Sequence, residues 1–487
     1  MKSGGRPSWH AVVAICVLGW VVLYAGRAVL APVLGAIGAE WSLDKARLGL
    51  VSSVFFLTYA AAQVPTGLLA DRFGKKMLLV GGLVAFALAT VLRGLAPSYT
   101  FFLVAAGLAG LAQGTYYPSQ FAISSAVIPP SRRGLGSAVI YSGMAVGTSA
   151  GLILGSTAAF TLGLGWRAPF WLLAFPTAAV ALLFARRVEE PRGGGDRSAE
   201  VLGPLPAGIS AALSPRLLAA YALNFTSLYA FFMLLTWLPY YLQYERGLDA
   251  SAAGLASSLT AWASIPGALI VGALSDRVGD RMRPLRVLLP AAAVSVAGLA
   301  YVESVGVLCV LLILYGLVGK STVDPLLVAR VSELAPPQRS ATALSFLNFA
   351  GMLASVVAPY VTGVMAETFG SMRPGFYLAA AILLAGSVVA LAASAVHARP
   401  EGTGVSERTG VSERTRALER TGAHGRNSGS GRQGAGAGEG KFPRSRERTG
   451  RSSRGAGSAG RKLPRDPEQA AGNPRRGRPR GGPTRVR

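Results

Sequence analysis

Long apolar stretches separated by short charged segments occupy the first 396 residues of this chain. A helix needs about 20 apolar residues to cross a hydrocarbon core, and these stretches have that length without the alternation of a strand. Lipid offers the backbone no hydrogen-bond partners, so spanning segments must be helices or closed barrels. We therefore predict an all-α integral membrane protein with twelve transmembrane helices, at about residues 9–36, 46–70, 77–96, 98–128, 134–160, 168–187, 216–243, 251–274, 285–303, 305–329, 341–366 and 373–396.

Composition and charge favour a membrane protein over an enzyme. Hydrophobic residues make up 51% of the chain, and most charged residues lie between the apolar stretches or after position 396. A soluble domain instead spreads its charge over every surface element. The sequence shows no phosphate-binding Gly-rich loop with its Lys, no hydrolytic triad and no metal-ligand spacing. It therefore predicts no catalysis, no cofactor and no bound metal.

Lys and Arg in the short loops predict the orientation in the membrane. Eighteen of them lie at the N-terminus and in the even-numbered loops, against six on the opposite side. Loops rich in Lys and Arg stay on the cytoplasmic side. We therefore expect a multi-pass protein of the plasma membrane with both termini in the cytoplasm, which an even number of spans also requires.

One charged hairpin occurs twice. The segment 67–76, with the sequence GLLADRFGKK, recurs 205 positions later as GALSDRVGDR at 272–281. Each copy ends one apolar stretch and precedes the next. The segments 129–132 and 336–339 form a second pair of similar loops, at the nearly equal offset of 207 residues. Two pairs at almost one offset indicate that half of a membrane protein was duplicated.

The duplication predicts the domain organisation. Residues 1–187 would form one six-helix half and residues 216–396 the other. The segment 188–215 between them is polar and rich in Gly and Pro, which is typical of a linker. We expect this linker in the cytoplasm.

The hairpin pattern G-x-[LA]-x-D-R-x-G-x-[RK] resembles the loop between the second and third helices of each half in the major facilitator superfamily of secondary transporters. This resemblance implies two pseudo-symmetric bundles that rock against each other to give alternating access, with substrate sites at their interface. It also implies that the hairpins form a latch that stabilises one state, whereas the alternative is that their charges only set topology. The latch residues would be Gly67, Asp71, Arg72, Gly74, Gly272, Asp276, Arg277 and Gly279.

Ionisable residues inside the spans are the strongest candidates for a substrate site, because charge is costly in a bilayer and usually faces a cavity or a partner. Arg27 lies in the first span, with Tyr24 one turn earlier on the same face. Lys320 and Asp324 lie four residues apart in the tenth span and share a face. Two cations and one carboxylate favour an anion. The alternatives are that Arg27 extends to the interface and that Lys320 and Asp324 pair with each other.

The stretch from Tyr24 through Arg27 and Tyr59 to Gln63 resembles the branch of the superfamily that transports sugar acids and other organic anions. In that branch an Arg at this place in the first helix contacts the anion, which implies the same role for Arg27. Other polar and aromatic residues on helices expected to line the cavity could contribute to a pocket, although each is more often a packing residue. Those included in the predicted site are Tyr59, Gln63, Gln113, Tyr117, Asn224 and Asn348.

Asp324 has two possible roles. Desolvation would raise the pKa of its carboxyl group and the neighbouring Lys320 would lower it, so the sequence leaves its protonation open. If transport is coupled to protons, Asp324 is the best proton carrier. If the protein is an exchanger or a uniporter, Asp324 is a gate or a counter-ion.

The segment after residue 396 differs from the rest of the chain. It contains 22 Lys and Arg against 8 Asp and Glu, many Gly, Ser and Pro, and few large apolar residues. Such a segment cannot bury enough surface to offset its chain entropy, so we expect residues 397–487 to be disordered. It could bind anionic lipid by charge, or it could be a repeat expansion without a selected role. Specific nucleic-acid binding is not expected, because it has almost no aromatic residues for stacking on bases.

The sequence therefore predicts a secondary transporter of a small organic anion, such as a carboxylate or sugar acid, with a proton or other counter-ion as a potential coupling partner. An exporter of amphipathic drugs driven by protons is the alternative within transport. A membrane sensor or anchor that displays the basic tail is the alternative from another class.

Overall fold

The computed structural model describes residues 8–190, 214–278, 282–335 and 340–398. These residues belong to one compact unit. The prediction of a disordered tail lies outside the described residues. Within the described part, the chain folds into helices and no strand occurs.

The helices before the linker form the first half of the bundle, and several spans consist of two consecutive helices. Their bounds are α1 (Trp9–Ala28), α2 (Leu30–Trp41), α3 (Lys45–Phe73), α4 (Lys75–Gly94), α5 (Tyr99–Gly114), α6 (Tyr116–Val127), the short η1 (Pro130–Arg132), α7 (Arg133–Ser156), η2 (Thr157–Thr161) and α8 (Ala168–Arg187).

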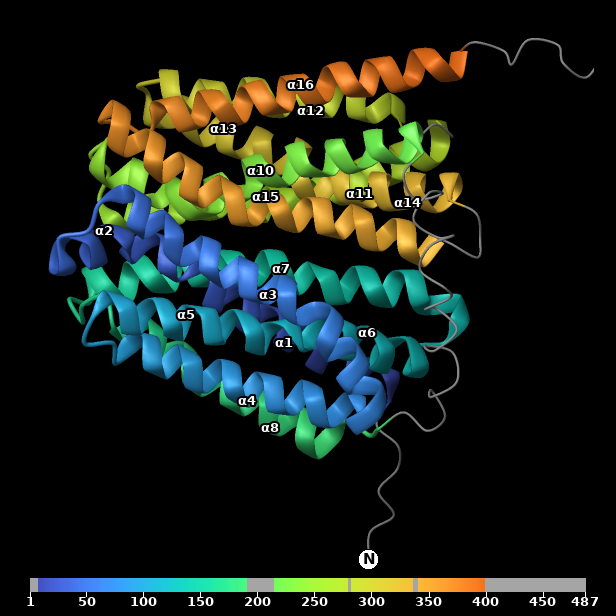
Figure 1. Cartoon of the computed structure of the whole chain (residues 1–487), viewed down its shortest axis with the longest axis horizontal. Helices are drawn as coiled ribbons and strands as arrows, with labels where there is room; N and C mark the ends of the chain where they lie inside the picture. The colour runs from blue at the N-terminus through green and yellow to red at the C-terminus, as the bar shows by residue number, and fades with distance from the viewer. Residues whose placement is uncertain (1–7, 191–213, 279–281, 336–339, 399–487) are drawn as a thin grey trace, which may run out of the picture. The chain divides into compact units, whose positions relative to one another are not determined.

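The second half repeats this arrangement. Its helices are α10 (Pro215–Tyr244), α11 (Ala250–Val278), α12 (Met282–Tyr301), α13 (Val305–Val318), α14 (Lys320–Leu334), α15 (Ser340–Phe369) and α16 (Arg373–Ala398). The third and sixth spans of each half pack together, as α4 with α8 and α12 with α16 (Figure 1). The first and fifth spans do the same, as α1 with α7 and α10 with α15. Equivalent helix pairs in both halves are what a duplication predicts.

The predicted membrane architecture is confirmed. Among the described residues, 10 stretches have the length and apolar composition of a membrane span. The other two predicted spans correspond to α3 and to α5 with α6. The first span is longer than predicted, because α2 continues to Trp41, and the tenth continues to Leu334.

Three spans are interrupted near their middle, at Val29, Thr115 and Gly319. Proline accounts for two of the interruptions, because it has no N–H to donate to the carbonyl four residues earlier. Pro32 follows the first break and Pro118 follows the second.

The carbonyl that Pro118 leaves without a helical donor is that of Gly114, and it accepts a hydrogen bond of 3.1 Å from the Thr66 hydroxyl on α3. A side chain from another helix thus donates the hydrogen bond that the proline cannot, as expected in a membrane interior. At the third break, Gly319 has an extended backbone, so α14 begins as a new helix inside the tenth span.

The two halves meet along α3 and α15. At the start of α3, the Lys45 backbone N–H donates to the Glu367 carboxylate at 3.1 Å, and the Lys45 ammonium donates to the Ala366 carbonyl at 3.3 Å. A carboxylate at a helix N-terminus and an ammonium at a helix C-terminus both match the helix dipoles. Farther along, the Ser53 hydroxyl donates to the Val356 carbonyl at 2.6 Å. We call this end of the bundle the Lys45 end.

The contact between α3 and α15 continues to the Asn348 amide, which donates to the Gln63 side-chain oxygen at 2.9 Å. Beyond that point, no neighbouring atom of the described residues lies within 4 Å of the position where a Cβ of Gly67 or Gly272 would stand. We call this the hairpin end. Within the described part of the chain, the halves thus contact each other at the Lys45 end and not at these two hairpin glycines.

The first hairpin turns at Gly74, which has a φ of +98° that favours glycine. The backbone N–H groups of Lys75 and Lys76 then donate to the two carboxylate oxygens of Glu190 at 2.7 and 2.8 Å. The start of the segment after α8 therefore caps the N-terminus of α4.

Gly49 on α3 allows close approach to α15, because a Cβ there would collide with the Pro359 carbonyl and touch the Trp237 ring. We expect Gly49→Ala to reduce contact between α3 and α15 at the Lys45 end. Overpacking costs about 1–3 kcal/mol, so cross-linking of the Ser53→Cys/Val356→Cys pair by a short bifunctional thiol reagent should slow about tenfold.

The control is Gly81→Ala, since the space beside Gly81 on α4 is open. Cys16 and Cys309 would be replaced by Ser in all variants. Equal cross-linking in the Gly49 and Gly81 variants would contradict the prediction.

Candidate functional site

The guanidinium of Arg27 lies in the interior of the bundle, at the break between α1 and α2. Its Nε donates to the Gln113 side-chain oxygen at 2.8 Å, next to the break between α5 and α6. The rings of Tyr24 and Tyr59 lie 4.6 and 4.4 Å from its central carbon. These rings stabilise the cation through their π faces.

Two hydrogen-bond donors of this cluster have no acceptor among the described residues. Arg27 is 9% exposed and Gln113 is 1% exposed. The Nη2 of Arg27 and the Nε2 of Gln113 are buried without a hydrogen-bond partner. Burying unpaired N–H donors is unfavourable, and more so for a charged group. The cluster therefore has two buried donors, on neighbouring side chains, that no group in the described part of the chain pairs with.

Lys320 and Asp324 lie in the first turn and a half of α14 and form an ion pair of 2.8 Å. The second carboxylate oxygen of Asp324, Oδ1, is buried without a partner. The Lys320 ammonium lies 5.4 Å from the centre of the Phe231 ring on α10. The sequence left open whether these two residues pair with each other, and the structure shows that they do.

The structure brings the two candidate sites together across the halves. Lys320 lies close enough to Arg27 and to the Tyr24 hydroxyl to interact with them electrostatically. The aromatic rings of Phe56 on α3 and Phe232 on α10 also meet across the halves, 4.6 Å apart. The ionisable residues found in the first and tenth spans therefore lie around one region between the halves.

Other predicted site residues are placed less centrally or are bonded to protein groups. Gln63 and Asn348 bond to each other across the halves. The Asn224 amide donates to the Leu347 carbonyl at 2.7 Å, which ties α10 to α15. Tyr117 is 40% exposed and its ring lies 6.2 Å from that of Trp20.

Sequence reasoning missed Tyr315 on α13. Its side chain is 3% exposed and its hydroxyl has no partner. It lies close enough to Asp324 for the two groups to interact electrostatically. A tyrosine within the otherwise apolar run 305–318 was the signal available in the sequence.

Comparison with known proteins shows the family. The model of the Major Facilitator Superfamily matches residues 16–302 and 222–428. This chain belongs to the major facilitator superfamily. Membership confirms the predicted fold class and identifies a multi-pass membrane transporter of a small molecule rather than an enzyme.

Individual relatives agree with this assignment. A gentisate transporter of Corynebacterium glutamicum is 30% identical over 370 residues, which cover 72% of this chain and 81% of the relative. A probable sulfoacetate transporter of Cupriavidus necator is 27% identical over 413 residues, which cover 78% of this chain and 93% of the relative. The crystal structure of a bacterial homolog of the human lysosomal transporter Spinster has the same fold, with a TM-score of 0.69 at 17% identity over 80% of this chain and 98% of that one.

The hairpin residues that the superfamily resemblance assigned to a latch are only partly described. The side chains of Asp71 and Asp276, and residue Gly279, lie outside the described residues. Arg72 and Arg277 are exposed. The latch remains a prediction. Among the described residues, no group of three or more His, Cys, Asp or Glu side chains could hold a metal ion.

The ion pair between Lys320 and Asp324 predicts how substitutions of these two residues change the stability of the folded protein. We expect Asp324→Leu to leave the Lys320 ammonium without its carboxylate partner and to destabilise the folded protein. The loss should be below the about 3–5 kcal/mol typical of fully buried pairs, because the two side chains are 18% and 30% exposed. The double variant Lys320→Met/Asp324→Leu should recover most of the loss, as measured by thermal unfolding in detergent.

The single variant Lys320→Met serves as the second arm of this cycle. Additive losses in the double variant would show that the two residues contribute independently and would contradict the prediction.

Proposed function

We propose that this protein moves a small organic anion across the plasma membrane and that a carboxylate of this anion binds between Arg27 and Gln113. The main support is the pair of buried, unpartnered donors, Arg27 Nη2 and Gln113 Nε2. A carboxylate accepts two hydrogen bonds in one plane, which suits a guanidinium and an amide side by side.

The charges around the site also favour an anion. Arg27 and Lys320 contribute two positive charges, and Asp324 contributes one negative charge that is already 2.8 Å from the Lys320 ammonium. The N-terminus of α14 begins at Lys320, and the positive end of a helix dipole also favours negative charge. Helix ends that point to anions at the middle of a span are common in transporters.

The names of the relatives support the same substrate class. Gentisate and sulfoacetate are both small organic anions with a carboxylate. The sugar acids considered from the sequence share this carboxylate. The proposal therefore rests on the carboxylate rather than on one particular acid.

The contacts between the halves suggest the direction in which the site opens. The hairpin end has the excess of Lys and Arg that places it in the cytoplasm. Contacts close the Lys45 end, while Gly67 and Gly272 face open space at the hairpin end. We infer an inward-facing state, with both chain termini in the cytoplasm.

Arg27→Gln tests the carboxylate site. Hydrogen bonds to charged groups contribute about 1.5–3 kcal/mol, so we expect the Kd for a stabilising carboxylate to rise by at least about tenfold. The measurement is ligand-induced thermal stabilisation of the full-length protein in detergent, with gentisate, sulfoacetate and benzoate as probes. Gln113→Ala should weaken binding in the same direction and by less.

Arg47→Gln is the matched control, because Arg47 is an exposed Arg of the same half that pairs with Asp44. If Arg27→Gln and Arg47→Gln changed carboxylate binding equally, the proposed site would be wrong. Stabilisation by lipophilic cations alone, unaffected by Arg27→Gln, would instead favour the drug exporter.

We further propose that Asp324 takes up a coupling proton. Its Oδ1 is buried without a partner, so a proton can bind there without displacing a hydrogen bond. We expect Asp324→Asn to abolish the stimulation of uptake by an inward proton gradient in proteoliposomes, while exchange of labelled for unlabelled substrate continues. Gradient-stimulated uptake that survives in Asp324→Asn would exclude this role.

A further inference from the structure

A cavity lies between helices of both halves, lined by residues of α7, α10, α11 and α13. Its volume is ≈ 20 Å³, about the space that one water molecule or one hydroxyl group occupies. Much of the wall is apolar and comes from α10, including Phe231 and Leu235. No lining residue within the described part of the chain is charged. The polar lining residues are Thr148, Ser257, Thr260 and Tyr315.

Two contacts link the cavity wall to the candidate site residues. Thr148 follows Gly147 on α7, and a Cβ at Gly147 would stand 3.0 Å from the Cβ of Tyr24, whose ring contacts Arg27. In the second contact, the Phe231 ring lies 5.4 Å from the Lys320 ammonium. One small group of a molecule held at Arg27 could therefore enter the cavity.

The hydrogen bonds of the lining groups define what can bind there. The hydroxyls of Thr148, Ser257 and Thr260 donate to carbonyls of their own helices at 2.9, 2.7 and 2.9 Å. Their protons are thus used, and their oxygens remain available as acceptors. Tyr315 differs, because its buried hydroxyl has no partner and can both donate and accept.

We propose that this cavity binds a hydroxyl group of the substrate, with Tyr315 as the residue that recognises it, so that the transported anion is a hydroxylated carboxylic acid. This inference rests on the proposed function, because it places the carboxylate of the same molecule at Arg27. It adds a second recognition point, on the other half of the protein.

The chemistry of the cavity favours a hydroxyl over other groups. A second carboxylate or an ammonium would enter a cavity without a charged lining group to pair with it, which is costly. An ether, ketone or halide could accept from Tyr315 and could not donate to the oxygens of Ser257 and Thr260. A hydroxyl does both. An acid without this hydroxyl would leave the buried Tyr315 unpaired, which is the situation in which polar sites discriminate most strongly.

The test compares acids that differ only in a hydroxyl. The probe pairs are 3-hydroxybenzoate with benzoate and 3-hydroxybutyrate with butyrate, and binding to the purified full-length protein is measured by calorimetry. We expect at least one hydroxylated acid to bind about tenfold more tightly than its partner. Tyr315→Phe should remove this preference and leave the affinity for the unsubstituted acid within about twofold.

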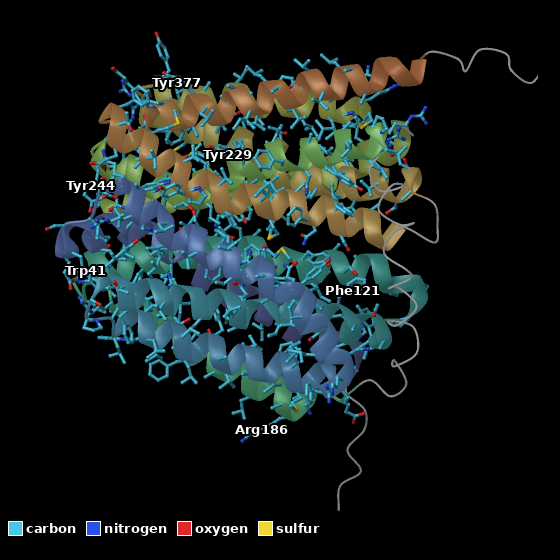
Figure 2. The ribbon with its side chains drawn as sticks, viewed as in Figure 1. Trp41, Phe121, Arg186, Tyr229, Tyr244 and Tyr377 are labelled. Atoms are coloured by element: carbon cyan, nitrogen blue, oxygen red, sulfur yellow. The ribbon has the colours of Figure 1, made fainter. Side chains whose placement is uncertain are left out.

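Tyr229→Phe is the matched control. Tyr229 on α10 (Figure 2) is also a buried tyrosine without a hydrogen-bond partner for its hydroxyl among the described residues. It is not among the residues that line the cavity. The control variant should keep the preference for the hydroxylated acid.

Two results would overturn the hydroxyl site alone: equal binding of both members of each pair by the parent protein, or a preference that persists in Tyr315→Phe. The proposed function and this inference would both be wrong if carboxylates did not bind the parent protein. Both would also be wrong if carboxylates bound the Arg27→Gln variant as tightly as the parent. The Arg27→Gln arm thus separates the two failures.

Discussion

The cation of Arg27, buried between α1, α3 and α5, is the constraint on which the site depends. A guanidinium keeps its positive charge in a protein. The surrounding helices stabilise it with the faces of Tyr24 and Tyr59 and with the oxygen of Gln113. These groups still leave one nitrogen without a partner. The protein thus folds around a charge that its own side chains do not fully neutralise.

The two halves share helix pairing and differ in chemistry. Duplication gives equivalent packing of α1 with α7 and of α10 with α15. The first half presents an unpaired cation, whereas the second half presents an ion pair, Lys320 with Asp324, and a free hydroxyl at Tyr315. Symmetric helix packing is sufficient for two bundles that move against each other. The recognition of a substrate must come from the residues in which the halves differ.

Much of the fold could be predicted from the sequence, because membrane spans are long and the hairpin occurs twice. Arg27, Lys320 and Asp324 could also be found, since a charge inside an apolar stretch is conspicuous. The contact of Arg27 with Gln113 joins residues 86 positions apart, and local spacing does not encode such a pair. The residue type of Asn224 likewise does not reveal that its amide donates to a backbone carbonyl and ties two helices together.

Tyr315 escaped the sequence analysis for a related reason. Tyrosine is common in membrane helices as a packing residue, and its hydroxyl becomes informative only when its lack of a partner is known. The breaks at Val29 and Thr115 were equally hidden, although Pro32 and Pro118 mark them in the sequence. A proline inside a span allows a break without requiring one, because neighbouring helices decide whether the freed carbonyl is satisfied.

A substrate that touches both halves would also explain how binding drives the conformational change. A ligand shifts an equilibrium only by the difference in its affinity for the two states. The hydrogen bonds that close the Lys45 end, at Lys45 and Ser53, contribute about 0.5–1.5 kcal/mol each. A carboxylate on the first half and a hydroxyl on the second would supply interactions of similar size. A bridging molecule would therefore favour whichever state lets it reach both recognition points at once.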